Sequence, residues 1–281
     1  MIGYNSLLVL LGTAILGLGA AVIGVFMMLR GRAMAADAAS HATLPGVALG
    51  FLLALSLGWH EGRHLPLMLF MAFLTAWLGM FTVNWLQRRS ILSADTAIAV
   101  VLSVFFAAGL LLLGYIQHLP LGSIAGLDSF LLGQTASLQK DEIIFLSLAM
   151  VAVLFIAFIL RKQYIMLAFD PNFSHLQGYQ AARLDGVMTS LMLVVVCLGL
   201  KTVGVVLVLA MLIMPAAAAK MLTQRLRPLF AMAALLGVTS AMLGVILSSR
   251  YPNIPTGSMI VLLGFGLVLL ALPVRLLRRI A

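Results

Sequence analysis

Residues 95–116 read DTAIAVVLSVFFAAGLLLLGYI, a run in which Asp95 is the only charged residue. A segment of roughly 20 mostly apolar residues can cross the hydrocarbon core of a bilayer as a helix. Similar apolar blocks occupy residues 6–29, 33–57, 65–86, 143–160, 185–200, 203–219, 229–249 and 257–274. The short blocks 185–200 and 203–219 are either two helices or one broken helix. We therefore predict an all-α, polytopic membrane protein with eight or nine transmembrane helices, in a single domain spanning residues 1–281.

The composition supports a membrane protein and excludes several other classes. Of the 281 residues, 63% are apolar, whereas only 17 are basic and 8 are acidic. A soluble enzyme, a disordered chain or a nucleic-acid-binding module needs more polar surface than this. The single cysteine, Cys197, lies in an apolar run and allows neither an internal disulfide nor a thiolate metal cluster. No basic segment precedes block 6–29, so we expect a retained helix rather than a cleaved signal peptide.

The basic residues are distributed unevenly between the two sides of the predicted bundle. Four fall on one side: Arg63, Lys140, Lys201 and Arg250. The other thirteen fall on the opposite side: Arg30, Arg32, Arg88, Arg89, Arg161, Lys162, Arg183, Lys220, Arg225, Arg227, Arg275, Arg278 and Arg279. Because Lys and Arg accumulate in cytoplasmic loops, the second side, with the C-terminus, is predicted to be cytoplasmic. This topology explains the basic excess without a nucleic-acid partner.

An ionisable pair stands inside the second apolar block. Asp37 and His41 are four residues apart, so on a helix they share one face. Ionisable groups at membrane depth are costly and point to function, and a carboxylate with an imidazole suits a divalent first-row metal. The alternative is a hydrogen-bonded pair that holds two helices together. The alanines around the pair allow another helix to approach closely.

A second cluster, residues 59–64, contains the H-E-x-x-H pattern of zinc metalloproteases in His60, Glu61 and His64. That chemistry needs both histidines on one face of a helix. Here the pattern falls in a short outer turn between two spans, with Gly62 inside it. A plain polar turn is our first interpretation, and a peripheral metal contact near the mouth of a pathway is the alternative.

Four stretches together resemble the integral-membrane permease subunits of metal ABC importers, the manganese/zinc/iron (ABC-3) family. They are DAASHATLPG at 37–46, the segment from Phe169-Asp170-Pro171 to Gly178, VGVVLVLAMLIMPAAAA at 203–219, and PTGS at 255–258. The resemblance implies that Asp37 and His41 bind the transported metal, with manganese or iron slightly preferred over zinc because of the pairing of Ser40 with Pro45. It implies no permanently bound cofactor.

The resemblance also implies partners and a place in the cell. It suggests a bacterial plasma (inner) membrane protein with a second permease subunit, two cytoplasmic ATP-binding subunits and an extracytoplasmic metal-binding protein. The inner loop 161–184 is similar to the coupling segment that docks on the ATPase. The residues implied in that contact are Asp170, Asn172, Phe173, His175, Leu176, Gly178 and Tyr179.

Two other functions remain open on the residues alone. The chain has no P-loop, so it is not expected to hydrolyse ATP or to be an enzyme. A secondary cation transporter driven by an ion gradient is the main alternative, but it requires ionisable residues in several spans. An intramembrane metalloprotease would depend on Glu61, and we expect Glu61→Gln to have a mild effect.

Overall fold

The computed structural model describes residues 4–58, 64–119, 140–250 and 255–280. All regular structure in these ranges is helical, which confirms the predicted fold class. The helices are α1 (Tyr4–Leu29), α2 (Ala35–Ala42), α3 (Leu44–Ser56), α4 (Leu65–Arg89), α5 (Ala94–Gln117), α7 (Lys140–Ile159), α8 (Arg161–Phe169), α9 (Pro171–Leu176), α10 (Ala181–Val203), α11 (Val205–Leu222), α12 (Leu226–Arg250) and α13 (Thr256–Ile280).

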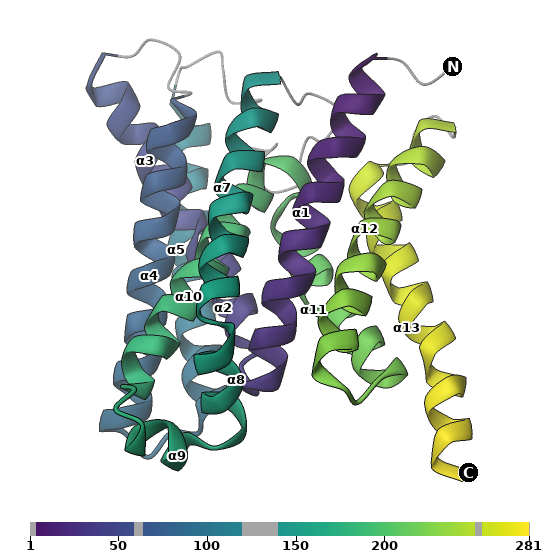
Figure 1. Cartoon of the computed structure of the whole chain (residues 1–281). Coiled ribbons are helices and arrows are strands. Elements are labelled where there is room, and N and C mark those ends of the chain that lie inside the picture. The colour runs from purple at the N-terminus through teal and green to yellow at the C-terminus, as the bar shows by residue number, and fades with distance from the viewer. Residues whose placement is uncertain (1–3, 59–63, 120–139, 251–254, 281) are drawn as a thin grey trace.

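Eight of the described segments are long and apolar enough to cross a membrane. One of them, Ala35–Ser56, is composed of α2 and α3 together, and α11 contributes a shorter apolar segment, Leu207–Leu222. The prediction of eight or nine spans is therefore confirmed. When α11 is included, successive segments run in opposite directions (Figure 1). As a result, α1 begins at one end of the bundle and α13 finishes at the other.

One end of the bundle gathers the basic helix termini. Arg88 and Arg89 lie in the last turn of α4, Arg161 begins α8, and Lys220 lies in the last turn of α11. These termini lie with the end of α13 at the lower edge of Figure 1. We call this the basic end. Its position agrees with the grouping of basic residues predicted from the sequence.

The blocks 185–200 and 203–219 form two separate helices. The sequence suggested a break near Thr202, but α10 continues through Val203 and the chain turns at Gly204. Gly204 has a φ of 89°, a conformation that side chains rarely tolerate, so a glycine allows the turn here. A Cβ on Gly257 would lie 2.7 Å from Cδ2 of Leu207, so the start of α13 packs directly against α11.

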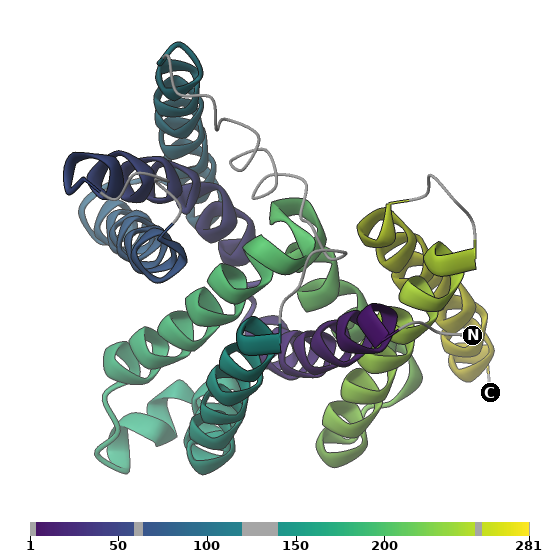
Figure 2. The ribbon, with the colours of Figure 1, turned by 90° about the horizontal axis from the view of Figure 1, so that it is seen from above.

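Two groups of helices flank a central set when the bundle is seen from above (Figure 2). The first group contains α3, α4 and α5, and the second contains α11, α12 and α13. Between them lies α1, which touches α7, α10, α11 and α12. The contact between α1 and α12 is close because a Cβ on Gly17 would lie 2.7 Å from the carbonyl oxygen of Gly237. The apolar stretch Ile124–Gly133, for which the sequence suggests a re-entrant or interfacial helix on the outer side, lies outside the described residues.

Candidate metal site and coupling segment

Within α2 the two ionisable residues occupy the one open face. The other six residues of this helix are buried: Ala35, Ala36, Ala38, Ala39, Ser40 and Ala42. Asp37 and His41 are each partly exposed. Buried small residues let neighbouring helices approach on all other sides. The structure therefore presents a carboxylate and an imidazole together at the open face of an otherwise enclosed helix.

The geometry of the pair is close. Nε2 of His41 lies 3.4 Å from Oδ1 of Asp37, and the side chains are 22% and 45% exposed respectively. The imidazole ring meets the ring of Phe106 edge-on, with centroids 4.9 Å apart. Nδ1 of His41 is buried and has no hydrogen-bond partner. Asp37 also lies in the first turn of α2, where the helix dipole favours a negative charge.

Close packing of α4 and α5 sets the position of α2. A Cβ on Gly79 of α4 would lie 2.9 Å from Cβ of Ala42. A Cβ on Gly109 of α5 would lie 2.7 Å from Cβ of Leu44 and 3.1 Å from Pro45. Both glycines thus allow backbones to approach where a larger residue would force them apart. Their contacts place α2 and its junction with α3 firmly in the bundle.

One chain offers two candidate ligands for a metal at this place. Among the described residues, no group of three or more His, Cys, Asp or Glu side chains is arranged to hold a metal ion. His60 and Glu61 lie outside the described residues. His64 is exposed and extended, directly before the first residue of α4. His64 therefore does not lie inside a helix, whereas the protease pattern requires both of its histidines on one helix.

The inner segment 161–184 contains two short helices at the basic end. α8 ends where the backbone N–H of Asp170 donates to the carbonyl of Met166 at 2.8 Å. The Asp170 carboxylate then accepts from the backbone N–H of Phe173 at 2.9 Å, which caps the start of α9. Pro171 occupies the first turn of α9. Asp170 therefore has a clear structural role, as the cap that allows the chain to turn between the two helices.

The residues implied by the family resemblance lie on the outside of this segment. Each of these is exposed: Asp170, Asn172, Phe173, His175, Leu176, Gly178 and Tyr179. Ser174, in contrast, is fully buried and anchors α9 against its neighbours. The Leu176 side chain is 84% exposed and those of Phe169 and Phe173 are also exposed. We call Phe169, Phe173, Leu176 and Tyr179 the apolar docking patch, after the ATPase contact that the family resemblance implies for this segment.

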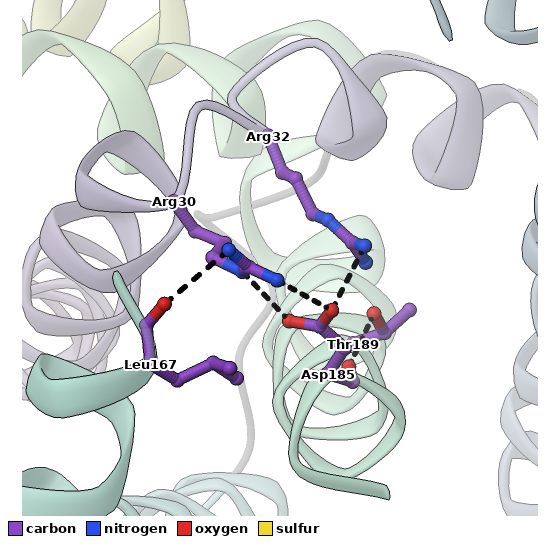
Figure 3. A network of polar contacts seen from close by, with 5 residues as sticks. All are labelled: Arg30, Arg32, Leu167, Asp185 and Thr189. Atoms are coloured by element: carbon purple, nitrogen blue, oxygen red, sulfur yellow. Dashed lines mark hydrogen bonds and ion pairs between the residues drawn. The ribbon is translucent and has the colours of Figure 1, made fainter. Parts of the chain in front are cut away.

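A charged network ties this segment to the helices around it (Figure 3). Asp185 of α10 accepts hydrogen bonds from Arg30, at 3.1 and 3.2 Å, and from Arg32, at 2.9 Å. Nη1 of Arg30 also donates to the carbonyl of Leu167 in α8 at 3.3 Å. The side chain of Thr189 donates to the backbone carbonyl of Asp185 at 2.8 Å. The network thus joins α1, α8, α10 and the loop that leads into α2.

Tyr164 lies beside this network and is largely buried. Its ring packs on Phe26 with centroids 5.6 Å apart, and its hydroxyl group is buried with no hydrogen-bond partner. Burial, and secondarily the negative charge of Asp185, raise the pKa of Tyr164. The phenol therefore stays neutral at physiological pH.

The sequence alone does not predict this network, because charge counting assigns Arg30 and Arg32 only to one side of the membrane and gives Asp185 no partner. One signal was available, because Asp185 is an acidic residue at the start of an apolar block on a side rich in cations. The identity of its partners depends on the tertiary structure, since more than 150 positions separate Arg30 from Asp185.

The chain is similar to known transport proteins along most of its length. Residues 4–275 match the ABC 3 transport family. The chain is 38% identical over 258 residues to the manganese transport system membrane protein MntC of Bacillus subtilis, covering 92% of this chain and 58% of that protein. It is 36% identical over 270 residues to the zinc transport system membrane protein TroC of Treponema pallidum, covering 96% and 88% of the two chains.

A solved structure supports the same fold. The chain superposes with a TM-score of 0.83 and 28% identity on a chain of PsaBC from Streptococcus pneumoniae in complex with Fab, covering 96% of this chain and 91% of that one. The family match spans almost all of the sequence. The chain is therefore a member of the ABC 3 transport family, as a multi-pass membrane subunit of the permease type.

Proposed function

We propose that the chain is the permease subunit of an ATP-driven importer of divalent transition metals, with Asp37 and His41 lining the metal pathway. The observation that carries this proposal is the composition of the open face of α2. Six of the eight residues of this helix are buried, and the two that remain accessible are a carboxylate and an imidazole 3.4 Å apart. Such a pair suits manganese, iron or zinc.

A second permease subunit completes the proposed site. One chain provides one carboxylate and one imidazole, and the 45% exposure of Asp37 leaves room for ligands from outside the chain. If the partner is a second copy, a two-fold axis beside α2 brings two Asp and two His together. Four such ligands, with water, form a complete coordination shell for a first-row metal.

Manganese or iron is our first choice of cargo, and zinc is the second. The choice rests on Ser40 and Pro45, whose pairing resembles the manganese/iron branch of the family. Among the relatives, one is named for manganese and another for zinc, at 38% and 36% identity. Ligand type alone selects weakly among these metals, so the cargo has to be measured.

The basic end is proposed to face the cytoplasm and to carry two ATP-binding subunits. The apolar docking patch on α8 and α9 fits a groove on such a subunit, and an extracytoplasmic metal-binding protein would meet the opposite end. Movement of the docking segment would reach α2 through the Asp185 network, because Arg32 lies three residues before the start of α2. Nucleotide-driven rigid-body motion of this kind would alternate access to the site.

The decisive experiment measures metal bound by the purified permease–ATPase complex and metal uptake by cells. Asp37→Asn and His41→Ala are expected to abolish bound metal and uptake while the complex still assembles. Asp95→Asn is the matched control, because Asp95 is an exposed carboxylate in the first turn of α5. Normal uptake in both α2 variants would remove the proposed site.

A second measurement separates the importer from a secondary transporter. Uptake by proteoliposomes should require ATP on the side of the basic end and should persist when ion gradients are collapsed. Uptake that follows an ion gradient without ATP would instead support the secondary transporter.

A further inference from the structure

A large groove opens at the basic end, away from the metal pathway. It has a volume of about 1120 Å³ and lies between α1, α7, α8 and the start of α12. Its walls are mainly apolar, with Phe26, Leu154 and Phe230 among the residues that line it. Four cations also line it: Arg161, Lys162, Arg225 and Arg227. The metal site and the Asp185 network use none of these four residues.

None of the described residues that line the groove is an Asp or a Glu, so the four cations face no carboxylate from the described part of the chain there. The ion pairs to Asp185 and Asp37 are made by other residues, namely Arg30, Arg32 and His41, and all four groove cations are exposed. Arg161 instead lies over the ring of Phe158, 4.1 Å from its centroid. The groove therefore carries a concentrated positive charge that an anionic ligand would balance.

The groove crosses the boundary between apolar core and charged surface. The span of α7 ends at Ile159, two residues before Arg161, and the span of α12 begins at Leu226, between Arg225 and Arg227. The opposite wall reaches Val22 of α1, roughly 10 Å along the helix from its last residue, Leu29. A ligand that fills this space needs a charged head at the surface and an apolar tail directed into the membrane.

We propose that this groove binds an anionic phospholipid of the leaflet at the basic end. The headgroup phosphate lies among Arg161, Lys162, Arg225 and Arg227, and an acyl chain follows Phe26, Leu154 and Phe230 into the bundle. Basic pockets between membrane helices recognise anionic headgroups in this way. A free phosphate ion would leave the apolar walls in water. A second copy docked face to face would bring two sets of four cations together, which is repulsive.

The test uses the full chain in its complex, in lipid nanodiscs and in detergent. Native mass spectrometry measures binding of phosphatidylglycerol and of phosphatidylethanolamine. Phosphatidylglycerol should bind in preference, and the double substitution Arg225→Gln/Arg227→Gln should weaken it about thirtyfold. The matched control is Arg88→Gln/Arg89→Gln, which removes two exposed cations from the same end but outside the groove. Arg225→Lys/Arg227→Lys should retain binding and so report on correct folding.

Several results would overturn the proposal. Equal binding of the two lipids, or an equal loss in the control variant, would show that the groove does not select an anionic lipid. Displacement of the lipid by millimolar inorganic phosphate would indicate a site for a soluble anion. An Ile165→Cys variant that forms an intermolecular disulfide on oxidation would place a second copy in the groove. This readout is clean because the native Cys197 is buried.

Discussion

The guanidinium of Arg32 lies 2.9 Å from Oδ2 of Asp185, which joins the loop before α2 to the beginning of α10. Arg30, at the end of α1, binds the same carboxylate and also reaches the carbonyl of Leu167 in α8. One carboxylate thus connects the helix that carries the candidate metal ligands with the segment that carries the docking patch. Its side chain is only 15% exposed, so water screens these charges weakly.

Asp185→Asn should destabilise the protein by roughly 3 kcal/mol, because it leaves two partly buried guanidinium groups beside each other without a counter-charge. Thermal unfolding of the purified chain measures this loss. Metal uptake should fall further than stability alone explains, whereas metal binding at Asp37 should persist in the folded fraction. Asp95→Asn again serves as the control, and an unchanged unfolding temperature in Asp185→Asn would contradict the role given to the network.

Gly109→Ala should disturb the site through packing alone. The new Cβ would lie 2.7 Å from Cβ of Leu44, so α5 or the α2–α3 junction has to move. Overpacking of this kind costs about 1–3 kcal/mol. Gly114→Ala in the same helix meets nothing within 4 Å and should be neutral or slightly stabilising. Equal unfolding temperatures for the two variants would show that the junction yields easily.

Leu176→Ser should weaken association with the ATPase. It removes the most exposed apolar side chain of the docking patch, and burial of a leucine contributes about 1.5–3 kcal/mol. We expect at least a tenfold loss of ATPase recovered with the tagged permease. Ile91→Ser is the matched control, since Ile91 is also exposed but lies between α4 and α5. If both variants retain the ATPase equally, the patch is not the docking surface.

Tyr164→Phe should leave the protein as stable as before, or slightly more stable, at neutral pH. The hydroxyl it removes is buried without a hydrogen-bond partner, so no favourable bond is lost. At high pH the two proteins should differ. The pKa of Tyr164 is raised above its ordinary value of 10, so above about pH 10 the unfolded chain loses this proton while the folded chain keeps it.

The free energy of unfolding of the unmodified protein should therefore fall as the pH rises above about 10. The free energy of unfolding of the Tyr164→Phe variant should fall by less over the same pH range. Thermal unfolding at pH 8 and at about pH 10.5 provides the comparison. Parallel loss of stability in both proteins would place the responsible group elsewhere.

Periodicity and charge were sufficient to predict the spans and their grouping. A run such as 95–116 has one stable solution in a bilayer, because only a helix satisfies its backbone hydrogen bonds internally. The break between α10 and α11 was harder to place. Lys201 and Thr202 interrupt the apolar pattern, but the helix ends at Gly204, where φ is positive. A hydropathy pattern does not report a backbone dihedral angle, so it could not locate this turn. The hydropathy of residues 161–184 likewise does not give the bounds of α8 and α9, because this segment is a polar loop between two apolar blocks.

The candidate site was predicted in part. The spacing of Asp37 and His41 placed them on one helix face, and the structure brings them within 3.4 Å of each other. Their role as metal ligands stays a prediction that the proposed measurements test. The spacing did not reveal that all six remaining residues of α2 are buried. Their burial depends on α4, α5 and α10, which come later in the chain.

The sequence alone determined that this is an all-helical membrane protein, which end of the bundle is basic, and which ionisable pair stands in an apolar block. These properties follow from local composition and helical spacing, so no long-range contact is needed to see them. The tertiary structure decided that Asp185 holds Arg30 and Arg32, that α2 has one open face, and that four cations line an apolar groove. Each of these depends on residues distant in the chain, which meet only because helix packing places their side chains together.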